Sequence, residues 1–131
     1  MQPEELVRRA WEARSRAYAP YSKFQVGAAV LADGEVFTGA NVENASFGLT
    51  VCAERVAILA AVAAGARSIE ALAVASGPGA SMCGACRQVL AEFAGETTRV
   101  YLADEAGEHR ERSVRELLPE AFGRAELESG G

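Results

Sequence analysis

The sequence predicts an α/β protein, a three-layer α/β/α sandwich built on a mixed five-stranded sheet. An Asp33-Gly34 dipeptide between two alternating apolar segments is typical of an antiparallel hairpin. In the second half, strand-like segments alternate with helix-like ones, which indicates parallel pairing with helices on the faces of the sheet. The 131 residues, half of them hydrophobic, are enough for one domain with a buried core.

The first half of the chain predicts a helix followed by the hairpin. Apolar side chains recur near helical spacing from Leu6 to Ala17, and Pro20 should end that helix because it disfavours helical backbone at the preceding residue. After Lys23, alternate residues are apolar, so Phe24 and Val26 should lie on one face of a strand. The predicted elements are a helix over 3–18, strands over 23–31 and 35–40, and a polar loop over 41–50.

The second half predicts alternating helices and strands. Gly65 suits the position just after a helix C-terminus. Residues 56–64 contain no polar side chain, and a helix that is apolar all round must be covered on every side, so a second subunit is a plausible part of the cover. The predicted elements are a helix over 52–64, a strand over 69–76, a helix over 83–93, strands over 99–102 and 108–114, and a helical turn or two over 116–122.

These elements form a single domain over residues 1–131, with a core from about 4 to 122. Residues 123–131 are expected to form a flexible tail, because the ends of a domain fray unless they are packed in place.

Charge and hydropathy narrow the classes of partner. The net charge is −5, from 13 basic and 18 acidic residues, which disfavours a nucleic acid polymer as partner. No apolar run approaches the length of a membrane span. The first residues lack the basic and apolar regions of a signal peptide, so a cytoplasmic protein is expected, and a membrane is not an expected partner.

The three cysteines predict a metal centre. Cys52 stands at the start of one predicted helix, and Cys83 and Cys86 stand at the start of another. Helix N-termini favour thiolate over thiol. Three thiolates can hold Zn²⁺ and leave the fourth position open for water, as in catalytic rather than structural zinc sites. Glu54, two residues after Cys52, is close enough to move protons to and from that water.

The residues next to the ligands matter for charge. Three thiolates leave the zinc site with a formal charge of −1, which opposes formation of a hydroxide nucleophile. Arg55 and Arg87 each directly follow a ligand group and could offset part of that charge.

Other interpretations of the same residues stay open at this point. The Cys83-x-x-Cys86 spacing also occurs in redox pairs, and Cys52 alone could be a small buried apolar residue. Glu54 could simply favour the helix dipole. His109, the one histidine, lies in a charged run and is expected at the surface rather than as a fourth ligand. Asn41 and Glu43 could equally be turn and surface residues.

Four separated blocks together resemble the small, homotetrameric cytidine deaminases. They are Tyr18-Ala-Pro-Tyr-Ser-Lys-Phe-Gln-Val-Gly-Ala28, Asn41-Val-Glu-Asn-Ala-Ser46, Cys52-Ala-Glu-Arg55 with Cys83-Gly-Ala-Cys-Arg-Gln88, and Leu117-Leu-Pro-Glu-Ala-Phe122. The two cysteine groups match the zinc-deaminase signature in its all-cysteine form. The resemblance runs from about residue 4 to residue 122.

The resemblance implies a role for each matching residue. One Zn²⁺ per chain would be held by Cys52, Cys83 and Cys86, with Glu54 as the proton shuttle. Arg55 would temper the thiolate charge. Phe24 would stack near the base, while Asn41 and Glu43 would bind the ribose hydroxyls and Val42 would offer at most its backbone. Phe122 would reach the active site of a neighbouring subunit.

The resemblance also implies a reaction and partners. Water would attack C4 of cytosine, ammonia would leave, and free cytidine or deoxycytidine would become uridine or deoxyuridine, a step of pyrimidine salvage. The enzyme would be a hydrolase acting on the C–N bond of a cyclic amidine. Its partners would be the nucleoside, water and further copies of the chain, most simply in a homotetramer.

Two positions depart from the family pattern, and three other functions remain possible. Met82 stands where the family usually has Pro, and Phe47 where it often has Tyr. A related deaminase of another cytosine compound, such as blasticidin S, a polynucleotide editor, and a catalytically silent zinc module are the alternatives. The Asn41-x-Glu43 pair favours a plain ribose, and the acidic net charge disfavours the editor.

Overall fold

The computed structural model describes residues 1–130. Within them lie one 3₁₀ turn, η1 (Phe47–Leu49), and the following helices and strands: α1 (Pro3–Arg14), β1 (Gly27–Ala32), β2 (Glu35–Ala40), α2 (Ala53–Ala63), β3 (Ile69–Ala75), α3 (Gly84–Phe93), β4 (Ala94–Ala103), β5 (His109–Ser113), α4 (Val114–Leu117) and α5 (Arg124–Ser129).

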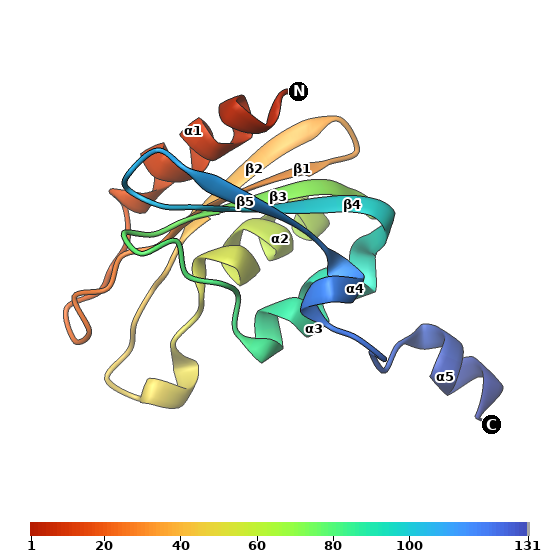
Figure 1. Ribbon diagram of the computed structural model, residues 1–131. Coiled ribbons are helices and arrows are strands. Elements are labelled where there is room, and N and C mark those ends of the chain that lie inside the picture. The colour runs from red at the N-terminus through yellow and green to blue at the C-terminus, as the bar shows by residue number, and fades with distance from the viewer. Residues whose placement is uncertain (131) are drawn as a thin grey trace.

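The strands form one five-stranded mixed sheet in the order β2-β1-β3-β4-β5. Strand β1 pairs antiparallel with both β2 and β3, β3 pairs parallel with β4, and β5 runs antiparallel to β4. Helix α1 covers one face of the sheet, and α2 and α3 lie on the other (Figure 1). The predicted α/β/α sandwich with a mixed five-stranded sheet is therefore confirmed.

Two apolar cores separate the three layers. The larger core lies between the sheet and helices α2 and α3, and includes Ile58, Leu72 and Leu90, which are fully buried. The smaller core lies under α1, where alanines of the sheet meet Leu6 and Ala10. These small side chains let α1 approach the sheet closely.

Glycines set how closely two helices lie on the sheet. A Cβ at Gly27 would lie 2.0 Å from the Ala10 carbonyl oxygen of α1. On the opposite face, a Cβ at Gly39 would lie 2.6 Å from the Ala57 nitrogen and 2.8 Å from the Ala53 oxygen of α2. Backbone-to-backbone contact at Gly39 therefore fixes the first turns of α2 directly against β2.

The hairpin and the central elements agree with their predicted positions. Strands β1 and β2 pair across Asp33-Gly34, with Ala32 opposite Glu35. Helix α2 ends at Ala63, and Gly65 lies just after its C-terminus, as expected, with a φ of +105°. The next N–H, from Ala66, donates to the Ala61 carbonyl. That pattern is a Schellman C-terminus, which only glycine adopts without strain.

The first predicted strand begins later than the alternation suggested. Strand β1 starts at Gly27, and Lys23 has a φ of +62°, so residues 23–26 are a loop segment rather than strand. Phe24 and Val26 do not belong to a strand. Side-chain hydrogen bonds hold the backbone of these two residues instead, as described below. The first helix also ends earlier, at Arg14.

The C-terminal elements are shifted from their predicted bounds. Helix α4 covers Val114–Leu117 instead of 116–122, because Ser113 and Glu116 form a capping box that starts it earlier. Residues 123–131 were expected to form a flexible tail. Up to residue 130 they contain the exposed helix α5, which projects away from α3 and α4 (Figure 1), while Gly131 lies outside the described residues. The flexibility of the tail stays a prediction.

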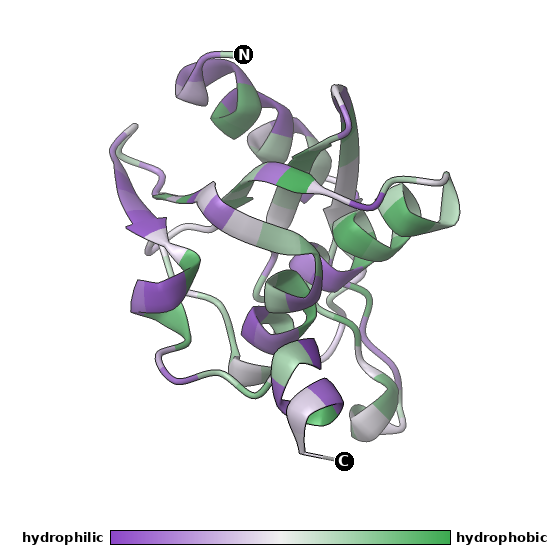
Figure 2. Ribbon diagram, turned by 90° about the vertical axis from the view of Figure 1, so that its right-hand side faces the viewer, coloured by the Kyte–Doolittle hydropathy of each residue, from purple (hydrophilic) through white to green (hydrophobic). Residues whose placement is uncertain are grey.

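Helix α2 is coloured almost entirely as hydrophobic in Figure 2. Its inner face, which includes Ala57 and Ile58, is buried, but Leu59 is 51% exposed and Ala60 and Ala63 are exposed beside it. Within residues 1–130, none of the helices is long and apolar enough to cross a membrane.

Candidate metal centre and active site

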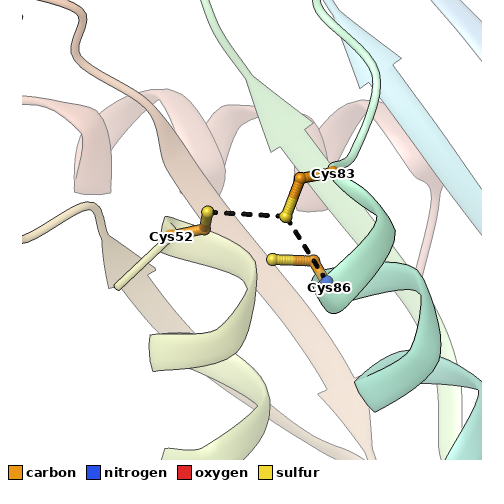
Figure 3. Close-up of side chains that lie close together, drawn as sticks. All are labelled: Cys52, Cys83 and Cys86. Atoms are coloured by element: carbon orange, nitrogen blue, oxygen red, sulfur yellow. Dashed lines mark hydrogen bonds between the residues drawn. The ribbon is translucent and has the colours of Figure 1, made fainter. Parts of the chain in front are cut away.

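The three cysteines converge where α2 and α3 begin. Cys52 is the N-cap residue of α2 and Cys83 is the N-cap residue of α3, with Cys86 in the first turn of α3. Their sulfurs point toward one another (Figure 3), and all three lie within 4.8 Å of each other. Residues 31 positions apart in the chain thus meet at the ends of two neighbouring helices.

The spacing of the sulfurs fits a single tetrahedral ion. At the usual Zn–S length of about 2.3 Å, two thiolates on one Zn²⁺ lie about 3.8 Å apart. The Cys52 and Cys83 sulfurs are 3.7 Å apart. His109 lies on β5, packed edge-on against Tyr101 with ring centroids 5.6 Å apart, and is not in the group of converging ligands. The residues present therefore fit a three-cysteine site for one Zn²⁺ per chain.

The surroundings of the cysteines change how readily each thiol loses its proton. A hydrogen bond with the Cys86 thiol lowers the pKa of Cys52 to about 5, and Arg55 lowers it further. The same bond, together with burial, raises the pKa of Cys86. The Cys86 N–H points at the Cys83 sulfur from 3.5 Å. Cys52 thus ionises readily while Cys86 keeps its proton, which a bound metal ion must displace.

The two arginines that follow the ligands have different surroundings. Arg55 points its Nη2 at the Cys52 sulfur from 3.9 Å, as expected for a residue that tempers thiolate charge. Arg87 instead donates to three oxygens, those of the Met82 and Leu117 carbonyls and the Ser81 hydroxyl. Arg87 therefore directs its hydrogen bonds at backbone and serine oxygens, and its expected effect on the thiolate charge stays a prediction.

Glu54 combines burial with access to the pocket beside the sulfurs. It lies in the first turn of α2, is 4% exposed, and lines the pocket next to Cys52. Burial raises the pKa of Glu54 to about 7, and the charge of Cys52 raises it as well. A carboxyl group with this pKa can both take up and release a proton near neutral pH.

The pocket has a volume of about 300 Å³ and mostly apolar walls. This is at the lower end of the range for small-molecule sites, which combine apolar walls with a few polar groups. It brings together four predicted site residues, namely Phe24, Asn41, Glu43 and Glu54, with two of the cysteines, Cys52 and Cys83. Cys86 is fully buried and does not line the pocket.

Asn41 and Glu43 also hold the loop that carries Phe24. The Asn41 amide donates to the Phe24 carbonyl at 2.8 Å, and its oxygen accepts from the Val26 N–H at 2.9 Å. The Glu43 carboxylate accepts from the backbone N–H of Tyr21 and from the Ser22 N–H and hydroxyl. The Ser22 hydroxyl bond also lowers the pKa of Glu43. Both side chains are thus fixed in place beside the pocket.

Two predicted site residues lie elsewhere in the chain's own structure. Val42 is 46% exposed, does not line the pocket, and exchanges backbone hydrogen bonds with Val51. Phe122 is 58% exposed and lies beside α3, where its carbonyl accepts from Gln88. Phe47, one of the departures from the family pattern, is exposed and packs edge-on against Tyr21.

Several pocket residues were not identified from the sequence. Ser22, Ser76 and Ser81 line the pocket; Ser76 is 1% exposed, and its hydroxyl accepts from the Ala80 N–H. Ser22 stands in the Tyr-Ser block before Phe24, and Ser81 stands two residues before Cys83, so proximity to a motif was the available signal. Ser76 has no such signal, because its role depends on where β3 ends.

Fold and site together define an α/β/α protein with a three-cysteine metal centre, a buried proton-transfer carboxyl group and a pocket for a small molecule. This is the arrangement of a zinc-dependent hydrolase. Residues 1–103 match the family model described as "Cytidine and deoxycytidylate deaminase zinc-binding region". The chain belongs to this family.

Individual proteins agree with that assignment over nearly the full length. The chain is 49% identical to a cytidine deaminase from Sporosarcina psychrophila over 131 residues, covering 97% of this chain and 96% of the relative. It is 50% identical to one from Halalkalibacterium halodurans over 125 residues, covering 93% and 95%. A crystal structure of cytidine deaminase from Burkholderia pseudomallei superposes with a TM-score of 0.87 at 49% identity, covering 93% of this chain and 100% of that one.

Proposed function

We propose that this protein removes the amino group of free cytidine and deoxycytidine by hydrolysis of the bond between C4 and the amine, giving uridine or deoxyuridine and ammonia. The observation that carries the proposal is the buried Glu54 beside three converging sulfurs on the wall of a small apolar pocket. Relatives that are about half identical over almost the whole chain bear the name cytidine deaminase.

Glu54 performs the proton transfers in this proposal. Zn²⁺ held by Cys52, Cys83 and Cys86 would act as a Lewis acid that makes water acidic enough to be a nucleophile near neutral pH. Glu54 takes one proton from that water and delivers it to N3 of the base. It then takes the second proton from the oxygen now bonded to C4 and delivers it to the departing amine. The water oxygen stays on C4 as the new carbonyl, and the amine leaves as ammonia.

The pocket residues orient the nucleoside. Phe24 offers a ring to the base, and Glu43 offers carboxylate oxygens to the ribose hydroxyls. Asn41 already uses one amide hydrogen for Phe24, so its second amide hydrogen is the one left for a hydroxyl. Both the N–H and the carbonyl of Val42 are bonded to Val51, so Val42 has at most the second lone pair of its carbonyl oxygen to offer.

The proposal extends to assembly and location. Phe122 is exposed at the end of the core and would complete the site of a neighbouring copy, while Arg55 tempers thiolate charge within its own chain. The exposed face of α2 supports a homo-oligomer, most simply a tetramer. A cytoplasmic location suits three cysteines that must stay reduced to hold a metal.

The test follows absorbance of cytidine with purified protein, with and without a zinc chelator. The proposal expects loss of the cytidine band that stops when zinc is removed and returns when zinc is restored. The matched variant is Glu54→Gln, which should lower turnover by about 10²- to 10⁴-fold while zinc content and oligomer size stay at the wild-type level.

The outcomes separate the alternatives. Bound zinc without loss of cytidine absorbance would redirect the function to another cytosine-bearing compound, and a series of sugar-modified substrates would then identify it. Wild-type turnover by Glu54→Gln would contradict the role given to this carboxyl group. Absence of both turnover and zinc binding would contradict the three-cysteine centre itself.

A further inference from the structure

Arg87 is the most heavily engaged arginine near the metal centre. It lies in the first turn of α3, directly after Cys86, and is half-buried. Its Nε donates to the Met82 carbonyl at 2.7 Å, and its Nη1 donates to the Leu117 carbonyl at 2.6 Å. Its Nη2 donates to the Ser81 hydroxyl at 3.0 Å. One planar guanidinium group thus joins three separate parts of the chain.

Two of these partners belong to the pre-ligand loop, defined as residues 77–82 between β3 and α3. Ser81 and the ligand Cys83 both line the pocket, and Met82 between them is 3% exposed. The position of the Met82 carbonyl sets the direction in which the chain enters Cys83. Arg87 therefore holds the backbone immediately before a metal ligand.

Other bonds hold the first part of the pre-ligand loop. Ala80 donates to the Ser76 hydroxyl at 2.8 Å, Arg110 donates to the Gly79 carbonyl at 2.8 Å, and Glu105 donates to the Gly77 carbonyl at 3.1 Å. These bonds fix residues 77–80 to the carboxyl end of the sheet. Arg87 bonds the next two residues, Ser81 and Met82, which lie between the pocket wall and the metal centre.

The third partner of Arg87 belongs to the C-terminal segment, defined as residues 117–122. The Leu117 carbonyl lies at the end of α4, where carbonyls have no partner within the helix. The next residue on α3, Gln88, donates to the Phe122 carbonyl at 2.8 Å. Two consecutive residues of α3 thus fasten both ends of the C-terminal segment.

We infer that Arg87 is a positioning residue that sets the Cys83 ligand and the Ser81 wall by tying the pre-ligand loop to the C-terminal segment. The inference deepens the proposed function, since it rests on Cys83 being a zinc ligand. Arg87 acts through the backbone that it holds and does not touch the sulfurs.

The geometry requires arginine rather than any cation. A guanidinium group presents five N–H donors in a fixed plane and can reach three oxygens in different directions at once. A lysine ammonium group is a single point of charge on a flexible stem, so it can satisfy only part of this set. Arg87→Lys should therefore fail to restore what Arg87→Gln loses, although it keeps the charge.

The main test measures release of zinc from the loaded protein to a chelator, without substrate. Changes to residues that support metal ligands usually alter metal affinity by about 10- to 100-fold, so Arg87→Gln and Arg87→Lys should both release zinc at least about tenfold faster. The control is Arg115→Gln, since Arg115 is exposed on α4 and the change in charge is the same. It should release zinc at the wild-type rate.

A spectroscopic measurement separates positioning from a loss of general stability. With Co²⁺ in place of Zn²⁺, the visible d–d bands should shift in both Arg87 variants at temperatures where the variants are fully folded. Lowered thermal stability with wild-type zinc release and unchanged Co²⁺ bands would overturn the inference and leave the proposed function intact. A wild-type protein that binds no zinc would overturn both.

Ser81→Ala provides a second, milder variant. It removes one of the three acceptors without changing charge, so it should speed zinc release less than Arg87→Gln does. Because the two residues act through one bond, the double variant should release zinc no faster than Arg87→Gln alone. Independent, additive effects would overturn the inference. If Arg87→Gln does not fold, an unchanged release rate in Ser81→Ala would overturn it as well.

Discussion

At the scale of single residues, the site depends on a carboxyl group whose surroundings destabilise its charged form. Glu54 is 4% exposed and stands beside the ionised Cys52, and both features disfavour its charged form. A raised pKa of about 7 corresponds to a cost of about 3 kcal/mol when the group must ionise in the metal-free protein. The same surroundings bring the pKa of Glu54 close to neutral pH, and this suits the group to proton transfer.

This cost predicts how the stability of the metal-free protein depends on pH. The folded protein holds the Glu54 proton more tightly than the unfolded chain, so the stabilising contribution is complete below pH 4.5 and is lost as the pH rises through about 7. Metal-free Glu54→Gln should match the wild type at pH 4.5 and exceed its free energy of unfolding by about 3 kcal/mol at pH 8. Urea unfolding at both pH values measures the difference.

Glu92→Gln is the control for that experiment, because Glu92 is exposed on α3. It should change the free energy of unfolding little at either pH. Equal stability of the wild type and Glu54→Gln at pH 8 would show that Glu54 is not held in a charge-excluding environment.

Asn41 has a structural task as well as a proposed contact with ribose. Asn41→Ala removes the partners of the Val26 N–H and the Phe24 carbonyl, so it should lower the free energy of unfolding by about 2 kcal/mol and raise the KM for cytidine. Denaturant unfolding and steady-state kinetics measure both effects. Asn44→Ala, at an exposed position nearby, should leave both nearly unchanged. A raised KM without loss of stability would mean that Asn41 acts on substrate alone.

The residues of the metal centre were predictable from sequence because each motif is local. Cys52 with Glu54, and Cys83 with Cys86, stand at helix starts that sequence spacing reveals directly. Ser76 could not be identified in the same way, because this serine lines the pocket only through the path of the chain after β3. The bond from Arg87 to the Leu117 carbonyl likewise joins residues 30 positions apart, so the sequence did not reveal it.

At the scale of elements, periodic patterns placed the hairpin and the buried helices well. The alternation after Lys23 was misleading, because Asn41 and Glu43 hold residues 21–26 with side-chain bonds that imitate the pairing of a strand. The start of α4 was missed, although the capping box of Ser113 and Glu116 is visible in the sequence. In both of these segments, side-chain hydrogen bonds and not hydrophobic periodicity set the bounds of the element.

The contact between α2 and β2 carries a prediction about the metal centre. In Gly39→Ala the new Cβ would lie 2.6 Å from backbone of α2, so the helix that carries Cys52 and Glu54 must shift. The variant should lose about 1–3 kcal/mol of stability and bind zinc more weakly. Thermal unfolding and competition with a zinc chelator measure these two effects.

Gly27→Ala is the matched comparison for that variant. It creates a similar clash with α1 on the opposite face of the sheet, away from the cysteines. It should also lose stability, but the folded protein should bind zinc like the wild type. Equal loss of zinc affinity in both variants would mean that the metal centre responds to general destabilisation and not to the position of α2 on β2.

At the scale of the whole molecule, the apolar outer face of α2 supports self-association. Leu59 is 51% exposed with Ala60 and Ala63 beside it, an unusual surface for a helix in water. Leu59→Glu should therefore shift the protein toward smaller species, as measured by sedimentation over a range of concentrations. Leu127→Glu, on the projecting helix α5, should keep the wild-type oligomer. An unchanged oligomer in Leu59→Glu would exclude this face as the interface.

The meeting of three sulfurs at the ends of two helices also makes the ion a removable cross-link. It closes a loop from Cys52 to Cys83 and binds the folded chain far better than the unfolded one. Free zinc at a thousand times its dissociation constant would add about 4 kcal/mol to the stability of the fold. Scarcity of zinc would then lower the amount of folded protein as well as its rate of turnover, so the supply of one ion sets both the abundance and the activity of the molecule.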